Sequence, residues 1–130
     1  MLKKIIEKHK ENIYLISRVL IGLLFLQHGI QKLFGLLGGK QVELISLIGL
    51  AGIIEFFGGV MIVLGLFTRF AAFIGIVDMI GAWFKGHIAN GWIPIINKGE
   101  LAVLYLAVFL LILIIGSGKL SLDKKLRNIE

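Results

Sequence analysis

The segment RVLIGLLFLQHGIQK, which runs from Arg18 to Lys32, decides how this chain folds. Its middle is apolar enough for lipid, yet it begins with an arginine and ends in a group of polar residues that includes His28. An arginine or lysine at the centre of a membrane helix costs roughly 2.5–3.5 kcal/mol on insertion scales, so such groups usually face partners inside the protein. The segment therefore predicts a small multi-span membrane protein whose buried polar residues carry its function.

Composition and the lengths of the apolar runs predict an all-α integral membrane protein. The chain has 130 residues, of which 58% are hydrophobic and 17% are charged, which is too apolar for an ordinary soluble domain. A helix needs about 20 apolar residues to cross the hydrocarbon core. Runs that meet or approach this length lie at residues 13–34, 44–67, 70–88 and 100–116. We expect a four-helix bundle that forms one domain over residues 1–130, in the cell membrane.

The formal net charge of +6 is concentrated at the two ends of the chain. The residues before the first span and after the last one that carry it are Lys3, Lys4, Lys8, Lys10, Lys119, Lys124, Lys125 and Arg127. The positive-inside rule therefore predicts that both termini lie in the cytoplasm. Residues 1–12 have the spacing of a short amphipathic surface helix, although a frayed basic end fits as well. Neither end interleaves its charges with aromatic residues, which argues against nucleic-acid binding.

A rise of about 1.5 Å per residue sorts the buried polar residues into two layers. The inner layer, nearer to the cytoplasm, holds Arg18 and Asp78, and Arg69 joins it from the turn between the second and third spans. We predict that Arg18 and Asp78 form an ion pair between two helices, because a paired charge is far less costly to bury than a lone one. These three residues are interpreted as structural. Beyond the fourth span, Asp123 is expected to cap a short helix before Lys124.

The outer layer is richer in ionisable residues and contains His28, Lys32, Glu55, His87 and Glu100. Glu55 shares a helix face with Gly52 and Gly59, because residues at i, i+3 and i+7 lie on one side of a helix. Small residues on such a face let membrane helices approach closely, so Glu55 is expected to point into a helix contact. Two interpretations of this layer remain open: a hydrogen-bonded packing network, or a polar pocket for a small ligand.

In the pocket interpretation, the two kinds of side chain have different roles. His28 and Glu55 exchange protons, because the charge of histidine changes near neutral pH. Lys32, His87 and Glu100 orient polar oxygens of the ligand. A metal site of two histidines and two glutamates is disfavoured, since no single helix carries a close ligand pair, and paired-histidine haem ligation is disfavoured too. The absence of cysteine excludes disulfides and thiol redox chemistry within this chain.

Six short motifs follow one another between Arg18 and Asp123. They are Arg18-x-x-x-Gly22, His28-Gly29-x-x-Lys32, Glu55-x-x-Gly58-Gly59, Gly65-x-x-Thr68-Arg69, Asn97-x-Gly99-Glu100-x-Ala102 and Gly116-x-Gly118-x-x-Ser121-Leu122-Asp123. In order and spacing they resemble the DoxX family of small four-helix membrane proteins of bacteria and archaea. Lys98 departs from the resemblance, since many relatives have a second glycine there. Some relatives are tied to quinone-linked redox chemistry, including a subunit of thiosulfate:quinone oxidoreductase and proteins of quinone or catechol resistance.

The resemblance implies a quinone-linked role, and quinone is the cofactor or substrate that it suggests. We interpret the chain as a membrane-embedded subunit or accessory protein of an oxidoreductase, with electrons supplied by a bound cofactor or a partner. The alternative is a non-enzymatic protein that binds or transports a small molecule, or an assembly factor for a membrane complex. The partners that fit are the lipid bilayer, a quinone-like molecule, a redox protein and a second copy of the chain.

Overall fold

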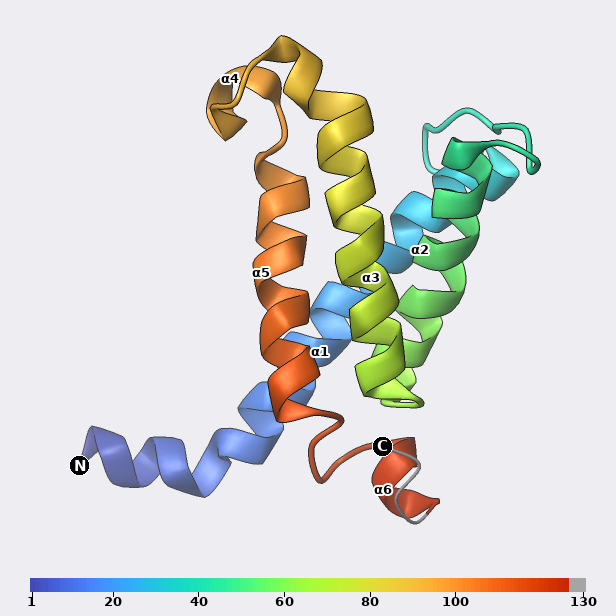
Figure 1. Cartoon of the computed structure of the whole chain (residues 1–130). Helices are drawn as coiled ribbons and strands as arrows, with labels where there is room; N and C mark the ends of the chain where they lie inside the picture. Colours follow the sequence, from blue (N-terminus) through green and yellow to red (C-terminus); the bar gives the residue numbers. More distant parts are fainter. Residues whose placement is uncertain (127–130) are drawn as a thin grey trace.

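The computed structural model describes residues 1–126, which contain helices and no strand. Its four long helices are α1 (Leu2–Phe34), α2 (Leu47–Leu64), α3 (Thr68–Ala82) and α5 (Glu100–Ile115) (Figure 1). Short helical turns connect α3 to α5 and follow α5: η1 (Trp83–His87), η2 (Ile88–Asn90), α4 (Pro94–Asn97) and α6 (Leu122–Lys125). Arg127, which the sequence assigns to the basic C-terminal end, lies outside the described residues.

Three of the helical segments are long and apolar enough to cross a membrane. They are Leu2–Phe34, Leu47–Leu64 and Thr68–Asn90, the last of which joins α3 to η1 and η2. Helix α5 is equally apolar but has only 16 residues. The first helix begins at Leu2 instead of residue 13, and its exposed N-terminal turns bend away from the other helices (Figure 1). The described N-terminal residues are therefore helical, as the surface-helix interpretation requires.

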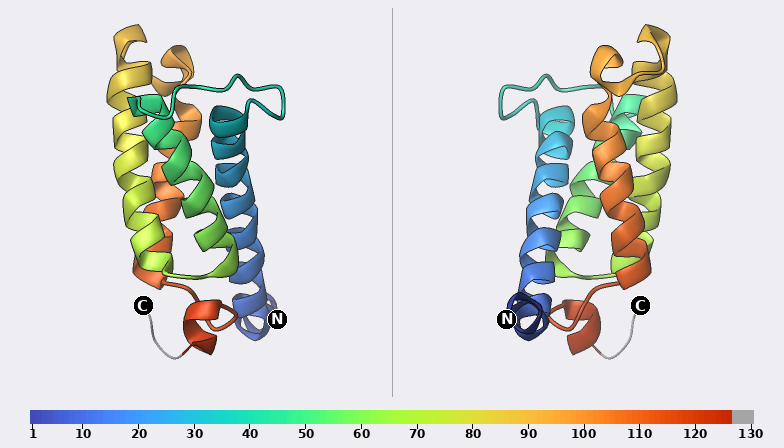
Figure 2. Two further views of the ribbon diagram at one scale, coloured as in Figure 1. Left: turned by 90° about the vertical axis from the view of Figure 1, so that its right-hand side faces the viewer. Right: turned by 90° about the vertical axis from the view of Figure 1, so that its left-hand side faces the viewer.

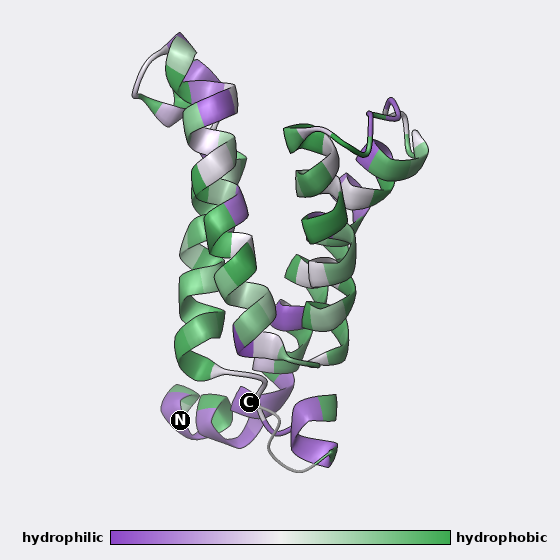
Figure 3. Ribbon diagram, turned by 45° about the vertical axis from the view of Figure 1, so that its right-hand side comes forward, coloured by the Kyte–Doolittle hydropathy of each residue, from purple (hydrophilic) through white to green (hydrophobic). Residues whose placement is uncertain are grey.

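The long helices form two pairs. Helix α1 packs along α2, α3 packs along α5, and the pairs meet chiefly through α2 and α3. The first turns of α1 and the short helix α6 lie at the same end of the molecule, which we call the base (Figure 2). The ribbons of the two pairs diverge toward the opposite, outer end, and hydrophilic residues gather mainly at the base and at the outer end (Figure 3).

Glycines let α1 and α2 approach closely. A Cβ atom on Gly59 would come within 2.7 Å of the backbone of Leu26, and one on Gly52 would lie 2.9 Å from Cβ of Lys32. Gly52, Glu55 and Gly59 are all buried, so the prediction that they share a contact face of one helix is confirmed. The close approach matters for the site, because it places the Lys32 side chain along α2.

An aromatic contact joins the two helix pairs. The ring of Phe25 on α1 lies with its centroid 4.8 Å from that of Phe109 and 5.4 Å from that of Tyr105, both on α5. The Tyr105 and Phe109 rings are stacked with centroids 5.8 Å apart. Aromatic pairs at such distances contribute about 0.5–1.5 kcal/mol beyond their buried area. This contact therefore forms the centre of the core.

Candidate functional site

Three helices bring a polar side chain to the same height above the base. Glu55 lies nine residues before the end of α2 at Leu64, and Asp78 lies ten residues after the start of α3 at Thr68. Tyr105 lies ten residues before the end of α5 at Ile115. At about 1.5 Å per residue, all three lie about 14–15 Å above the helix ends at the base.

Helix α1 completes this group, which we call the central cluster: His28, Lys32, Glu55, Asp78 and Tyr105. The Lys32 ammonium forms an ion pair with Oε1 of Glu55, and the His28 ring lies edge-on to the Tyr105 ring with centroids 6.0 Å apart. Asp78 interacts electrostatically with both Glu55 and Lys32. All four long helices therefore contribute to one polar cluster inside an apolar protein.

Three oxygens of the central cluster are buried without a hydrogen-bond partner among residues 1–126. They are Oε2 of Glu55, Oδ2 of Asp78 and the hydroxyl of Tyr105. These residues are only 4%, 9% and 3% exposed. A buried polar atom left without a partner costs about 1–3 kcal/mol, and native proteins contain few of them. Three in one cluster indicate a place where another polar molecule completes the hydrogen bonding.

The aromatic contact closes the central cluster on its base side. Phe25 precedes His28 by one helical turn on α1, and Phe109 follows Tyr105 by one turn on α5, so both rings lie below the polar side chains. The cluster thus combines hydrogen-bonding groups on all four helices with an aromatic floor, in which the Phe25 and Phe109 rings meet edge-on. This arrangement suits a ligand that has a ring and polar oxygens.

His87 and Glu100, which the sequence places in the same outer layer, do not join the central cluster. His87 lies in η1, where its Nδ1 is 3.1 Å from the carbonyl oxygen of Asn97 and its ring is near that of Trp83. Glu100 is exposed at the start of α5, more than one turn above Tyr105. Both residues lie at the outer end. His87 lies there because α3 continues through the wider π-helical turn η1 before the chain reverses.

The predicted ion pair between Arg18 and Asp78 is absent. Arg18 is buried, and its guanidinium donates hydrogen bonds to the carbonyl oxygens of Ser117 and Leu120, the latter at 3.0 Å. The carboxylate that interacts with it electrostatically is that of Asp123. The depth estimate ignored the direction in which each side chain points: Arg18 points toward the chain that folds back under the base, whereas Asp78 lies in the central cluster.

Asp123 has a different role from the one predicted. It does not cap α6, because Ser121 accepts the hydrogen bond from the Lys124 amide at 3.2 Å. Instead, Asp123 is fully buried and its two carboxylate oxygens accept three hydrogen bonds of 2.7–2.9 Å, from the amides of Phe67 and Thr68 and from the Thr68 hydroxyl. It therefore caps the start of α3 from a distant part of the sequence.

Arg18, Thr68, Ser117, Leu120 and Asp123 form what we call the base cluster. A Cβ on Gly65 would lie 2.6 Å from both the Arg18 guanidinium and Cβ of Ser121, so only glycine fits at this crossing. Exposed Arg69 lies beside this cluster and donates to the carbonyl oxygen of Leu113 at 2.9 Å, which ties the start of α3 to the end of α5.

Sequence reasoning missed two members of the central cluster. Tyr105 carries the only polar side chain between residues 101 and 115, which was the available signal. Asp78 was placed in the wrong layer because the turn between α2 and α3 was assigned two to three residues away from its observed ends. Among residues 1–126, no three histidine, aspartate or glutamate side chains are grouped so that they could hold a metal ion.

Two pockets lie away from the central cluster. A small apolar groove of about 190 Å³ runs between α3 and α5 near Trp83 and Phe84, and a larger pocket of about 370 Å³ lies at the base. The predicted cavity that His28, Glu55 and the other outer-layer residues would line together does not coincide with either of them.

The chain is similar to a known protein family and to several bacterial proteins. The DoxX family profile matches residues 13–88. An uncharacterised protein of Haemophilus influenzae is 37% identical, over 92% of this chain and 95% of its own length. An uncharacterised membrane protein of Mycobacterium tuberculosis is 31% identical, over 84% and 78%. A Bacillus subtilis protein named "Putative oxidoreductase CatD" is 29% identical, over 84% and 83%. No solved structure matches the chain.

Proposed function

This chain belongs to the DoxX family and is a multi-pass membrane protein, and we propose that its central cluster binds a quinone or a similar small aromatic molecule. The observation that carries this proposal is the convergence, above an aromatic floor, of three buried oxygens that have no hydrogen-bond partner among residues 1–126. A ligand that lacked polar atoms would leave these oxygens unpaired, and a ligand without a ring would leave the floor without its best packing partner.

The chemistry of a quinone matches the groups in the cluster. A quinone carbonyl accepts a hydrogen bond, for which the Tyr105 hydroxyl is a donor, and a quinol hydroxyl donates one, for which the free oxygens of Glu55 and Asp78 are acceptors. Lys32 holds the other Glu55 oxygen and so fixes the direction of the carboxylate. The cluster can therefore bind the ligand in either oxidation state.

Reduction of a quinone to a quinol takes up two protons and two electrons. We propose that His28 and Glu55 pass the protons, since both lie at the cluster and a histidine titrates near neutral pH. The electrons come from a redox protein or a cofactor bound in a complex, in which this chain is a subunit or accessory protein. The name of the Bacillus subtilis relative supports an oxidoreductase setting.

A binding measurement tests the site. Equilibrium dialysis of a short-chain quinone against the purified protein in detergent should give saturable binding. Tyr105→Phe should weaken it about threefold to tenfold, since one neutral hydrogen bond is worth about 0.5–1.5 kcal/mol. The matched control is Tyr14→Phe, which removes a hydroxyl that donates to the Gly116 carbonyl at the base. Equal binding by both variants would contradict the proposal.

The absorption spectrum of the purified protein separates the oxidoreductase from its alternative. A flavin or haem band in the protein, or in a complex purified with it, supports the redox role. Quinone binding with a featureless spectrum and no redox partner favours a non-enzymatic carrier or an assembly factor.

We also propose that α1, α2, α3 and α5 cross the membrane as one four-helix domain with the base in the cytoplasm. The lysines of residues 1–12 and of residues 119–125 lie at that end, as the positive-inside rule requires. A topology reporter fused to the C-terminus should therefore report the cytoplasm, and one inserted at Gly38 should report the exterior. Reversed signals would place the base outside.

A further inference from the structure

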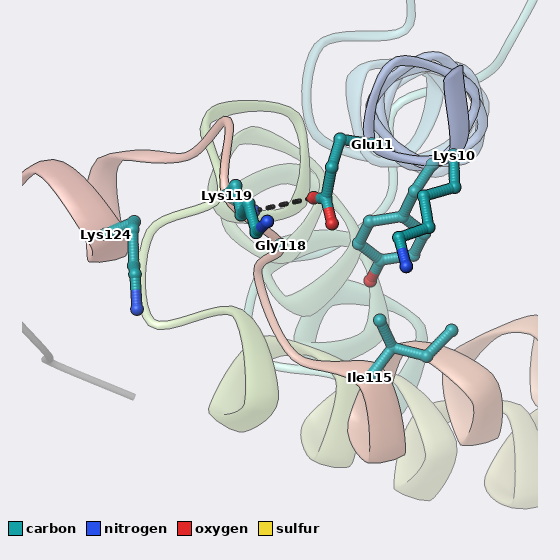
Figure 4. A pocket seen from close by; sticks show the side chains of 7 residues that line it. Lys10, Glu11, Ile115, Gly118, Lys119 and Lys124 are labelled. Atoms are coloured by element: carbon teal, nitrogen blue, oxygen red, sulfur yellow. Dashed lines mark hydrogen bonds between the residues drawn. The ribbon is translucent and has the colours of Figure 1, made fainter. Parts of the chain in front are cut away.

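One pocket lies at the base, far from the central cluster. We call it the base pocket; its volume is about 370 Å³. Three separate segments surround it: the N-terminal part of α1, the end of α5 with the chain that follows, and α6 (Figure 4). The residues that line it are Lys10, Glu11, Tyr14, Ile115, Gly118, Lys119 and Lys124.

The walls of the base pocket are strongly cationic. Three lysines and one carboxylate, that of Glu11, are among the lining residues, which gives the lining a formal charge of +2. Oε2 of Glu11 is occupied by the backbone amide of Lys119 at 3.1 Å, so this carboxylate holds the loop in place (Figure 4). The ammonium groups of Lys119 and Lys124 have no hydrogen-bond or ion-pair partner within residues 1–126, while Lys10 pairs with Glu7 in an exposed contact.

The base pocket also has an apolar side, formed by Ile115 and the ring of Tyr14. Gly118 packs against that ring in a left-handed conformation with φ 74°, and a Cβ there would lie 2.8 Å from Cδ1 of Tyr14. Ile115 is the last residue of α5, after which the chain becomes polar and basic. The pocket thus lies where α5 ends and the charged base begins. Figure 3 shows this change from hydrophobic helices to a hydrophilic base.

We propose that the base pocket binds a phosphate-bearing anion, supplied in the membrane by the headgroup of an anionic lipid. Lysine ammonium groups are donors for phosphate oxygens, and basic segments beside a membrane helix attract anionic lipids. The apolar side accepts the start of an acyl chain, which free phosphate does not have. A bound headgroup would link the N-terminal turns of α1 to α6, which otherwise share few contacts.

Native mass spectrometry of the full chain, released from detergent containing phosphatidylglycerol or phosphatidylcholine, tests this proposal. The pocket variant is Lys119→Gln combined with Lys124→Gln. The matched control is Lys3→Gln combined with Lys4→Gln, which removes the same charge from exposed positions outside the pocket. A second arm titrates inorganic phosphate into each protein in phosphatidylcholine nanodiscs by calorimetry.

The expected result is one phosphatidylglycerol retained by the wild type and by the control, at least fivefold less by the pocket variant, and no retention of phosphatidylcholine. If the wild type and the control bind inorganic phosphate and the pocket variant does not, the pocket is an anion site that soluble phosphate can also fill. Equal losses in both variants would mean diffuse attraction to a basic surface, and no binding in either arm would leave the pocket without an anion; both results overturn the proposal. Circular dichroism confirms that the variants are folded.

Discussion

The base cluster and the central cluster are both buried and polar, but they differ in how completely their hydrogen bonds are made. At the base, both oxygens of Asp123 accept hydrogen bonds from neighbouring groups, and the Arg18 guanidinium donates to two backbone carbonyl oxygens. Only Nε of Arg18 has no partner among residues 1–126. In the centre, three oxygens on three helices have no partner among the described residues. A nearly complete network fixes the fold, whereas an incomplete one leaves groups for a ligand.

The largest expected effect is at the base. Asp123→Ala removes the two carboxylate oxygens that accept from three donors. Hydrogen bonds to a charged group are worth about 1.5–3 kcal/mol each, so the free energy of unfolding should fall by about 3 kcal/mol or more. Ser121→Ala is the control two residues away; it removes the hydroxyl that caps the four-residue helix α6 and donates to the Gly118 carbonyl at 2.9 Å, and it should cost only about 0.5–2 kcal/mol. Thermal melts in detergent compare them. Equal losses would mean that Asp123 does not fasten α3.

A smaller effect is expected where packing supports the central cluster. Gly52→Ala should destabilise the protein by about 1–3 kcal/mol, because its Cβ would press on Cβ of Lys32, and it should also weaken quinone binding. Gly81→Ala is the matched control on α3, since a Cβ there meets nothing within 4 Å. This control should be neutral or more stable by up to about 1 kcal/mol. A Gly52→Ala protein with wild-type stability and binding would refute the packing argument.

The smallest expected effect is the coupling between the two clusters. Arg18→Gln and Asp78→Asn should change the free energy of unfolding additively, within about 0.3–0.5 kcal/mol, because the two side chains share no partner. A double-mutant cycle measured by thermal or chemical unfolding gives this number directly. A coupling free energy of 1 kcal/mol or more would support the Arg18–Asp78 ion pair that the sequence predicts. The two clusters would then form one network.

Sequence reasoning succeeded where the signal was local to one helix. The spacing of Gly52, Glu55 and Gly59 was enough to predict a buried contact face, and that face is where Lys32 meets Glu55. Sequence reasoning failed where a contact joins residues that are far apart in the chain. Nothing near Asp123 indicates that it caps α3, because its partners lie 55 and 56 residues away.

Boundary errors of a few residues had a larger consequence for the site. Each residue of error at a helix end moves a side chain by about 1.5 Å, so an error of two residues for α3 and three for α2 separated Asp78 from Glu55 by a false difference in depth. Depth also gives no direction around the helix, which is why Arg18 and Asp78 were paired. Helix ends and facing directions depend on packing between helices, which periodicity within one segment does not encode.

The most direct test of the difference between the two clusters is a melting-temperature measurement. The rise in melting temperature that a saturating short-chain quinone produces is compared in three proteins: the wild type, Glu55→Gln and Thr68→Val. Ligand at 100 times its Kd stabilises the folded state by about 2.7 kcal/mol. Glu55→Gln should melt somewhat lower without quinone, since the amide keeps an oxygen for Lys32 but not the charge, and it should gain little from quinone. Thr68→Val should melt lower, because it loses a hydrogen bond to Asp123, yet gain the full rise. A full rise in Glu55→Gln, or a rise lost in Thr68→Val, would contradict the assignment of binding to the centre and stability to the base.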